Sequence, residues 1–124
     1  MKEWTIKVFG EKKSDVDDWI NELPSKAHAR MDNIISYMEI TKDWTRTGYF
    51  SPLKGHRGIN EIRFTFQSIQ YRPLGCYGPG DKEFTILIGA IEQGDRFNPI
   101  NAPLIAENRR NDIRDGKEQT HEYN

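Results

Sequence analysis

The chain has 124 residues, of which 35% are hydrophobic and 30% charged, and its net charge is −1. This length fits one domain with a modest core. No apolar run reaches the roughly 18 residues of a membrane span, and the first residues lack the apolar core of a signal peptide. The single cysteine, Cys76, excludes an internal disulfide. We therefore expect a soluble protein of the reducing cytoplasm, with no membrane association.

Charge is distributed unevenly along the chain. Residues 42–72 carry six Lys or Arg side chains against two acids, a net charge of +4, whereas the remaining residues carry 12 basic and 17 acidic side chains, a net charge of −5. A basic segment in a weakly acidic chain indicates a local anion-binding site rather than a surface that coats a polyanion. Chance clustering of cations in a solvated loop is the alternative.

The first third of the chain predicts one strand and two helices. Residues 4–9 alternate between apolar and polar side chains, which is typical of a strand. Ser14 and Asp17 have the spacing of a capping box, which predicts a helix start, and Pro24 separates this helix from a second one. Apolar residues at helical spacing run through both helices: Val16, Trp19, Ile20 and Leu23 in the first, and Ala27, Met31, Ile34, Ile35 and Met38 in the second.

A long loop and three antiparallel strands are expected next. The periodicity is lost from about residue 41 to residue 58, and a loop of this length in a small domain indicates function. The segment Gly78-Pro79-Gly80-Asp81 is a turn between two of the strands. The three strands are predicted at residues 59–66, 69–77 and 84–92.

A final helix is predicted at residues 102–113, with Asn101 as its N-cap. Residues 115–124 are polar and are expected to form a flexible tail, so residues 1–114 form the single folded domain. The predicted fold class is α+β: an N-terminal strand, a pair of helices, a three-stranded antiparallel meander and a C-terminal helix. We expect the helices to cover one face of the sheet and to leave the other partly open.

The register of the first predicted hairpin determines which charged side chains meet. If its loop has two or four residues, Phe64 pairs with Tyr71, and Arg63 lies opposite Arg72 on the open face. Like charges in directly opposed positions destabilise a sheet by roughly 0.2–1 kcal/mol. Such a pair indicates either an anionic ligand or a carboxylate that bridges both arginines, and Glu61 is the candidate for that bridge.

The loop before these strands supplies further groups for phosphate chemistry. Cleavage of RNA by its own 2′-hydroxyl requires a base for that hydroxyl, cations for the crowded phosphorus and an acid for the leaving 5′-oxygen. Lys54 and Arg57 add cations, and His56 is a candidate base because imidazole titrates near neutral pH; an exposed loop histidine without a role is the alternative. His28 and His121 have no second ligand at metal spacing, so we expect no metal site and no cofactor.

Several short motifs occur in a fixed order between about residue 23 and residue 113. They are Leu53-Lys54-Gly55-x-x-Gly58-Ile59-x-Glu61-Ile62-Arg63, then Tyr71-Arg72, then an apolar strand, then Asn98-Pro99 and a helix with Ile105-Ala106-Glu107-x-Arg109. This series resembles the RelE/ParE toxin superfamily, and most of all its phage-derived HigB-like branch.

The resemblance implies the toxin of a type II toxin–antitoxin system, with a helical pair on an antiparallel sheet. RNase members of the superfamily enter the ribosomal A site and cleave mRNA without a metal, using basic residues on the open sheet face. The resemblance also implies a cognate antitoxin from a neighbouring gene, often a helix-turn-helix protein. The site residues expected on these grounds are Arg63, Arg72, His56 and Lys54 for catalysis, and Arg57, Glu61 and Arg46 for substrate binding.

Two other functions fit the same pattern. ParE-like relatives inhibit DNA gyrase, and a non-catalytic phage or prophage interaction protein of this fold would hold a peptide partner on its open face or sheet edge. The string Glu92-Gln93-Gly94-Asp95 stands where many relatives have a phenylalanine and paired lysines, which favours the non-catalytic alternative. For a nuclease, we expect Arg72→Ala to abolish growth arrest and to leave the fold intact.

Overall fold

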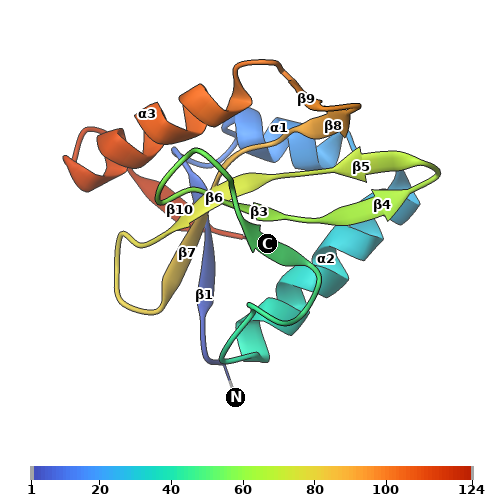
Figure 1. The fold of residues 1–124 in the computed structure, drawn as a ribbon. Helices are drawn as coiled ribbons and strands as arrows, with labels where there is room; N and C mark the ends of the chain where they lie inside the picture. The colour runs from blue at the N-terminus through green and yellow to red at the C-terminus, as the bar shows by residue number, and fades with distance from the viewer. Residues whose placement is uncertain (1, 124) are drawn as a thin grey trace.

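The computed structural model describes residues 2–123, which form helices and two β-sheets (Figure 1). The predicted α+β class is confirmed. None of the helices in these residues has the length and apolar character that a membrane crossing requires. In chain order the elements are β1 (Thr5–Phe9), α1 (Asp15–Asn21), α2 (Ser25–Ile40), β2 (Phe50–Pro52), β3 (Asn60–Ile62), β4 (Phe64–Phe66), β5 (Ile69–Tyr71), β6 (Leu74–Tyr77), β7 (Glu83–Ile88), β8 (Ile91–Gln93), β9 (Arg96–Asn98), α3 (Ala102–Arg114) and β10 (Thr120–Glu122).

Each strand of the predicted meander bends from one sheet into the other. A six-stranded sheet has the order β10-β1-β7-β6-β3-β2, and a four-stranded sheet has the order β4-β5-β8-β9. The breaks fall at Arg63, at Arg72 and Pro73, and at Gly89 and Ala90. At the second break, Pro73 has no N–H to donate to the hydrogen bonds between strands. At the third break the Trp19 ring packs so closely on Gly89 that an added Cβ would lie 2.0 Å from it. The prediction of three continuous strands therefore missed these bends.

The first hairpin has the predicted register. Phe64 pairs with Tyr71, and their rings stack with centroids 5.0 Å apart. The loop consists of Gln67 and Ser68, which have φ angles of 50° and 66°. Positive φ at both central residues is what a two-residue type I′ turn requires. The alternation of apolar side chains was therefore sufficient to place this pairing.

Helices lie on both faces of the six-stranded sheet. Every residue from Phe84 to Ile88 is buried, which requires cover on both faces of β7 because alternate side chains point in opposite directions. α1 and α2 lie on one side, and α3 packs on β6 and β7 from the other (Figure 1). The expectation that the helices leave one face open is wrong for this sheet. Exposed sheet surface is found on the four-stranded sheet, where Thr65 and Gln70 are exposed.

Polar side chains hold the ends of the helices. The predicted capping box of α1 is confirmed, since the Asp17 N–H donates to Ser14 Oγ (3.3 Å) and the Ser14 N–H donates to Asp17 Oδ2 (3.0 Å). Arg109 of α3 donates to both carboxylate oxygens of Asp15, at 3.0 and 2.6 Å, and so ties α3 to α1. Asn101 occupies the N-cap position of α3, but its side chain makes no capping hydrogen bond.

The C-terminal residues differ from the flexible tail that we expected. β10 pairs antiparallel with β1 at the edge of the six-stranded sheet, with Val8 opposite His121. The Tyr123 hydroxyl donates to Asp32 Oδ1 on α2 (2.5 Å), and burial together with this carboxylate raises the pKa of the phenol. Strand pairing and polar contacts hold this segment, and among its described residues Tyr123 is the one hydrophobic side chain packed against the core, so no apolar periodicity predicts it. The folded unit extends to Tyr123.

Candidate functional site

The basic loop at residues 53–58 is the tip of a hairpin that joins β2 to β3. Two successive turns build it: the His56 N–H donates to the Leu53 carbonyl (3.2 Å), and the Ile59 N–H donates to the His56 carbonyl (3.0 Å). The third residue of each turn is a glycine, Gly55 or Gly58, with φ of 84°. A turn with positive φ at its third residue selects glycine there. The spacing of the two glycines thus shapes the loop.

The two turns present a pair of cations with a histidine between them. Lys54 and Arg57 are the second residues of the two turns, and both side chains are exposed. Arg46, in the segment before β2, is exposed as well. Among residues 2–123 none of these three cations has a carboxylate within ion-pair distance. They are available to an anion from solution.

His56 is held by a carboxylate that sequence reasoning did not select. Its Nδ1 lies 2.5 Å from Oε2 of Glu107 on α3, across a separation of 51 residues. The side chains are 34% and 37% exposed. Because an ionised carboxylate only accepts, Nδ1 carries the hydrogen of this bond, and Nε2 is the ring nitrogen that Glu107 does not engage. Glu107 occurs in the matched motif of the final helix, but no local pattern connects it to the loop.

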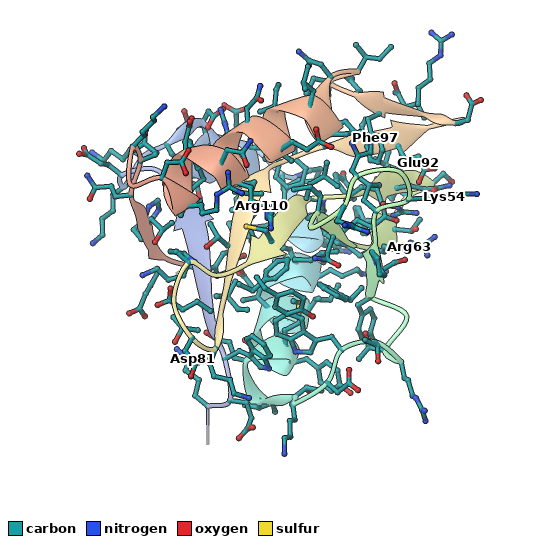
Figure 2. The ribbon with its side chains drawn as sticks, turned by 60° about the vertical axis from the view of Figure 1, so that its left-hand side comes forward. Lys54, Arg63, Asp81, Glu92, Phe97 and Arg110 are labelled. Carbon is teal, nitrogen blue, oxygen red and sulfur yellow. The ribbon has the colours of Figure 1, made fainter. Side chains whose placement is uncertain are left out.

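The loop also rests on α3 through Gly58. A Cβ at this position would lie 2.7 Å from Cζ of Arg110, so the guanidinium covers the glycine backbone. In Figure 2 Arg110 projects from α3, and Lys54, Arg63 and Glu92 are seen on one side of the molecule, away from the turn that carries Asp81. Contacts of His56 and Gly58 with one helix fix the position of the loop.

Arg72 is enclosed by the fold. It is 5% exposed, and its guanidinium donates to Glu92 Oε1 (3.1 Å), to Gln70 Oε1 (2.8 Å) and to the carbonyl of Tyr71 (2.8 Å). These acceptors lie on β5 and β8, at the point where the strands bend between the sheets. Arg72 therefore links two strands of the fold and does not present its charge to solvent.

Arg63, in contrast, is an exposed cation. Its side chain is 46% exposed, and Nε lies 3.5 Å from Oε1 of Glu61. The ladder of β4 and β5 ends at the Phe64–Tyr71 pair, and the Arg63 N–H donates instead to the carbonyl of Tyr49 (2.7 Å). Glu61 makes an ion pair with Arg63 but not with Arg72, so it does not bridge the two arginines.

Four charged side chains, Glu61, Arg63, Arg72 and Glu92, surround the bend, and the pKa of Glu61 is raised there. Burial raises the pKa of the Glu61 carboxyl, the charges of Arg63 and Arg72 oppose this rise, and the nearby Glu92 carboxylate adds to it. The net direction is upward. Two carboxylates therefore accompany two arginines at the bend. Arg63 is the exposed one of the two arginines, and the loop adds the exposed cations Lys54 and Arg57.

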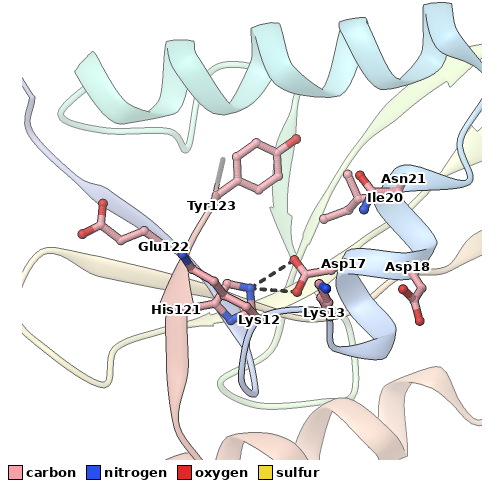
Figure 3. A pocket seen from close by; sticks show the side chains of 9 residues that line it. All are labelled: Lys12, Lys13, Asp17, Asp18, Ile20, Asn21, His121, Glu122 and Tyr123. Atoms are coloured by element: carbon pink, nitrogen blue, oxygen red, sulfur yellow. Dashed lines mark hydrogen bonds and ion pairs between the residues drawn. The ribbon is translucent and has the colours of Figure 1, made fainter.

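A second histidine–carboxylate pair lies between β10 and α1. His121 Nε2 is 2.8 Å from Asp17 Oδ2, and Nδ1 is 2.7 Å from the carbonyl of Gly10. Figure 3 shows the pair at a hollow of about 220 Å³ that Lys12 and Lys13 also line. Burial of the Asp17 carboxyl acts to raise its pKa, but hydrogen bonds from His121 and Ser14 bring it below the usual value. Both ring nitrogens of His121 are engaged.

Other chemistries have little support in the described part of the chain. Within residues 2–123 no three His, Cys, Asp or Glu side chains gather in an arrangement that could hold a metal ion. Cys76 is buried on β6. Burial raises the pKa of its thiol to about 11, so the reactive thiolate is scarce at neutral pH.

Comparisons of the chain with protein-family models, with curated proteins and with solved structures give no match. The chemistry of the loop site and the motif resemblance are therefore the grounds for a functional proposal.

Proposed function

We propose that the protein is an RNA-cleaving toxin of the RelE/ParE type, acting at the loop of residues 53–58 and the exposed side of the four-stranded sheet. The observation that carries this proposal is the pair of His56 and Glu107. The imidazole is oriented through Nδ1, its Nε2 is left to accept a proton, and it lies between the exposed cations Lys54 and Arg57. An oriented imidazole beside cations is suited to proton transfer at a phosphodiester.

In the proposed reaction His56 Nε2 takes the proton of an RNA 2′-hydroxyl. Nδ1–H remains bonded to Glu107, whose charge stabilises the imidazolium that forms. The 2′-oxygen attacks the adjacent phosphorus, and the bond from phosphorus to the 5′-oxygen breaks. The products are a 2′,3′-cyclic phosphate and a 5′-hydroxyl, whose oxygen takes its proton from water. The hydroxide that remains takes the proton of the imidazolium and restores neutral His56.

The cations divide into two roles. Lys54 and Arg57 from the loop, and Arg63 from the sheet, supply positive charge to the pentacoordinate phosphorus. Arg72 is a positioning residue, because its guanidinium is used by Glu92 and Gln70 beneath the surface. This revises the catalytic role that the sequence alone predicts for Arg72.

The motif resemblance extends the proposal to ribosome-bound mRNA as substrate and to an antitoxin from a neighbouring gene as inhibitor. The charge of the chain supports a substrate presented by a larger particle. A protein with net charge −1 and a small basic face gains little from counterion release on free RNA. Contacts with the ribosome would then supply much of the binding free energy.

A second candidate function is a non-catalytic interaction protein of the same fold. The observation that favours it is the charge balance at the bend, where Glu92 pairs with Arg72 and Glu61 with Arg63. A near-neutral surface suits a peptide partner better than a polyanion.

Inducible expression with and without the neighbouring gene separates the two candidates. We expect the wild-type protein to arrest growth and to create new mRNA 5′ ends, the neighbouring gene to relieve both effects, and His56→Gln to abolish both. His28→Gln is the matched control, because His28 is a partly exposed histidine on α2 whose neighbour is Asp32. Growth without arrest, or arrest without new 5′ ends, would refute the nuclease proposal.

A further inference from the structure

A groove between α2 and β4 opens beside Arg63. It has a volume of about 410 Å³, and its lining includes Arg30 and Tyr37 of α2, Tyr49 before β2, and Arg63 and Phe64 at the bend. It lies outside the loop that carries His56, but it shares Arg63 with the proposed cleavage face.

Two tyrosine rings are exposed in this groove. Tyr37 is 45% and Tyr49 41% exposed. Their ring centroids are 6.0 Å apart and their planes are inclined by 80°, the edge-to-face arrangement that aromatic pairs prefer. Each ring restrains the other, so a flat ligand would meet aromatic surfaces that are already in place.

The groove is basic as well as aromatic. Arg30 Nη1 donates to the carbonyl of Thr65 (2.7 Å), which fixes its guanidinium at the rim. Arg63 stands at the same groove with its side chain 46% exposed. The described residues that line the groove include no Asp or Glu side chain, and the acid nearest to its cations is Glu61, whose Oε1 lies 3.5 Å from Nε of Arg63. Flat aromatic surfaces with cations and without acids fit a ligand that joins a planar ring to a phosphate.

We propose that this groove is a subsite for one nucleotide of single-stranded RNA, whose base stacks on the face of one of the two rings, Tyr37 or Tyr49, and meets the other ring edge-on, and whose phosphate is held by Arg63. The identity of the ligand as RNA rests on the proposed function. Every base has a π face, so stacking of this kind adds affinity with little sequence preference. The subsite anchors the strand on one side of the phosphodiester bond that is cleaved beside His56.

A binding experiment with an uncleavable strand tests the subsite without requiring catalysis. The probe is a fluorescent 2′-O-methyl tetranucleotide, titrated with purified full-length protein and followed by anisotropy. Tyr37→Leu and Tyr49→Leu keep an apolar side chain but lose the ring, whereas Tyr37→Phe and Tyr49→Phe keep the ring. We expect each Leu variant to bind roughly 5- to 150-fold more weakly and each Phe variant to bind like the wild-type protein.

The outcomes separate the subsite from the nuclease proposal. Ring-dependent binding by a protein that leaves mRNA intact would support the subsite and overturn the cleavage mechanism. Binding that is equal in the Leu and wild-type proteins, or absent in the wild-type protein, would overturn the subsite, whatever the result for cleavage. Thermal melting of each variant verifies that a loss of binding is not a loss of fold.

Discussion

The His56–Glu107 and His121–Asp17 pairs have the same chemistry and opposite surroundings. His121 has both ring nitrogens engaged, by Asp17 and by the Gly10 carbonyl, and its side chain is 12% exposed. His56 has only Nδ1 engaged, by Glu107, and its side chain is 34% exposed. The first pair joins a sheet edge to a helix, and the second leaves a ring nitrogen, Nε2 of His56, without a partner among residues 2–123, at a partly exposed position.

The two arginines at the bend repeat this contrast. Arg72 is enclosed and donates to three acceptors of the fold, whereas Arg63 has one long ion pair and faces solvent. A charged side chain on a basic segment is therefore not by itself a ligand-binding group. The enclosed groups are expected to govern stability, and the open ones to govern activity.

The largest effect on stability is expected at Arg72. Arg72→Ala removes a buried guanidinium and leaves Glu92 and Gln70 without their donor, so we expect a loss of about 2–3 kcal/mol in the free energy of unfolding. Arg63→Ala is expected to cost less than about 1 kcal/mol, because its ion pair is exposed. Urea unfolding measures both. Equal losses would contradict the division into enclosed and open groups.

Gly58→Ala tests whether the docking of the loop matters for activity. The substitution places a Cβ on a residue with φ of 84°, 2.7 Å from Cζ of Arg110. We therefore expect the free energy of unfolding to fall by about 1–2 kcal/mol and RNA cleavage to become slower. The matched control is Gly94→Ala between β8 and β9, where φ is 65° and no atom lies within 4 Å of the added Cβ. Its strain is similar, and its cleavage rate should be that of the wild-type protein. A normal cleavage rate in Gly58→Ala would show that the loop need not be docked.

The smallest effects are expected in the way the free energy of unfolding depends on pH. The pKa of Asp17 is lowered in the folded protein, so its contribution to stability is present above its ordinary pKa and is lost as the pH falls through the folded value. Asp17→Asn should lower the free energy of unfolding by about 1 kcal/mol at neutral pH. It should also make the loss of stability at acidic pH less steep than in the wild-type protein. The pKa of Glu61 is raised, so its ionisation lowers stability as the pH increases, and Glu61→Gln should remove that loss.

Unfolding free energies from about pH 3 to pH 7 test both signs, because each slope follows the difference in bound protons. Changes in slope relative to the wild-type protein that have the same sign in the two variants would show that one of the two environments is wrongly described.

The periodic elements of this fold were accessible from its sequence. Ser14 and Asp17 marked the start of α1, the apolar stripe marked α2, and the alternation around Phe64 placed the hairpin register that the structure confirms. These features depend on residues close together in the chain, where spacing alone determines which side chains share a face.

The remaining features depend on distant partners. Bends at Arg63 and Pro73 divide strands that read as continuous, and α3 covers a sheet face that was expected to be open. His56 was selected as a base, but its partner Glu107 is 51 residues away. Arg72 lay in the same motif as Arg63, and only its burial distinguishes the two. No local pattern encodes such contacts.

The most direct test of the His56–Glu107 pair compares two histidine substitutions in one assay. RNA cleavage in a translation reaction is measured for His56→Gln and His121→Gln and expressed per folded molecule. Loss of the base should slow cleavage by about 10²–10⁴-fold in His56→Gln, whereas His121→Gln should lower stability and leave the rate per folded molecule unchanged. Wild-type cleavage by His56→Gln, or an equal fall in both variants, would contradict the assignment of His56 as the proton acceptor.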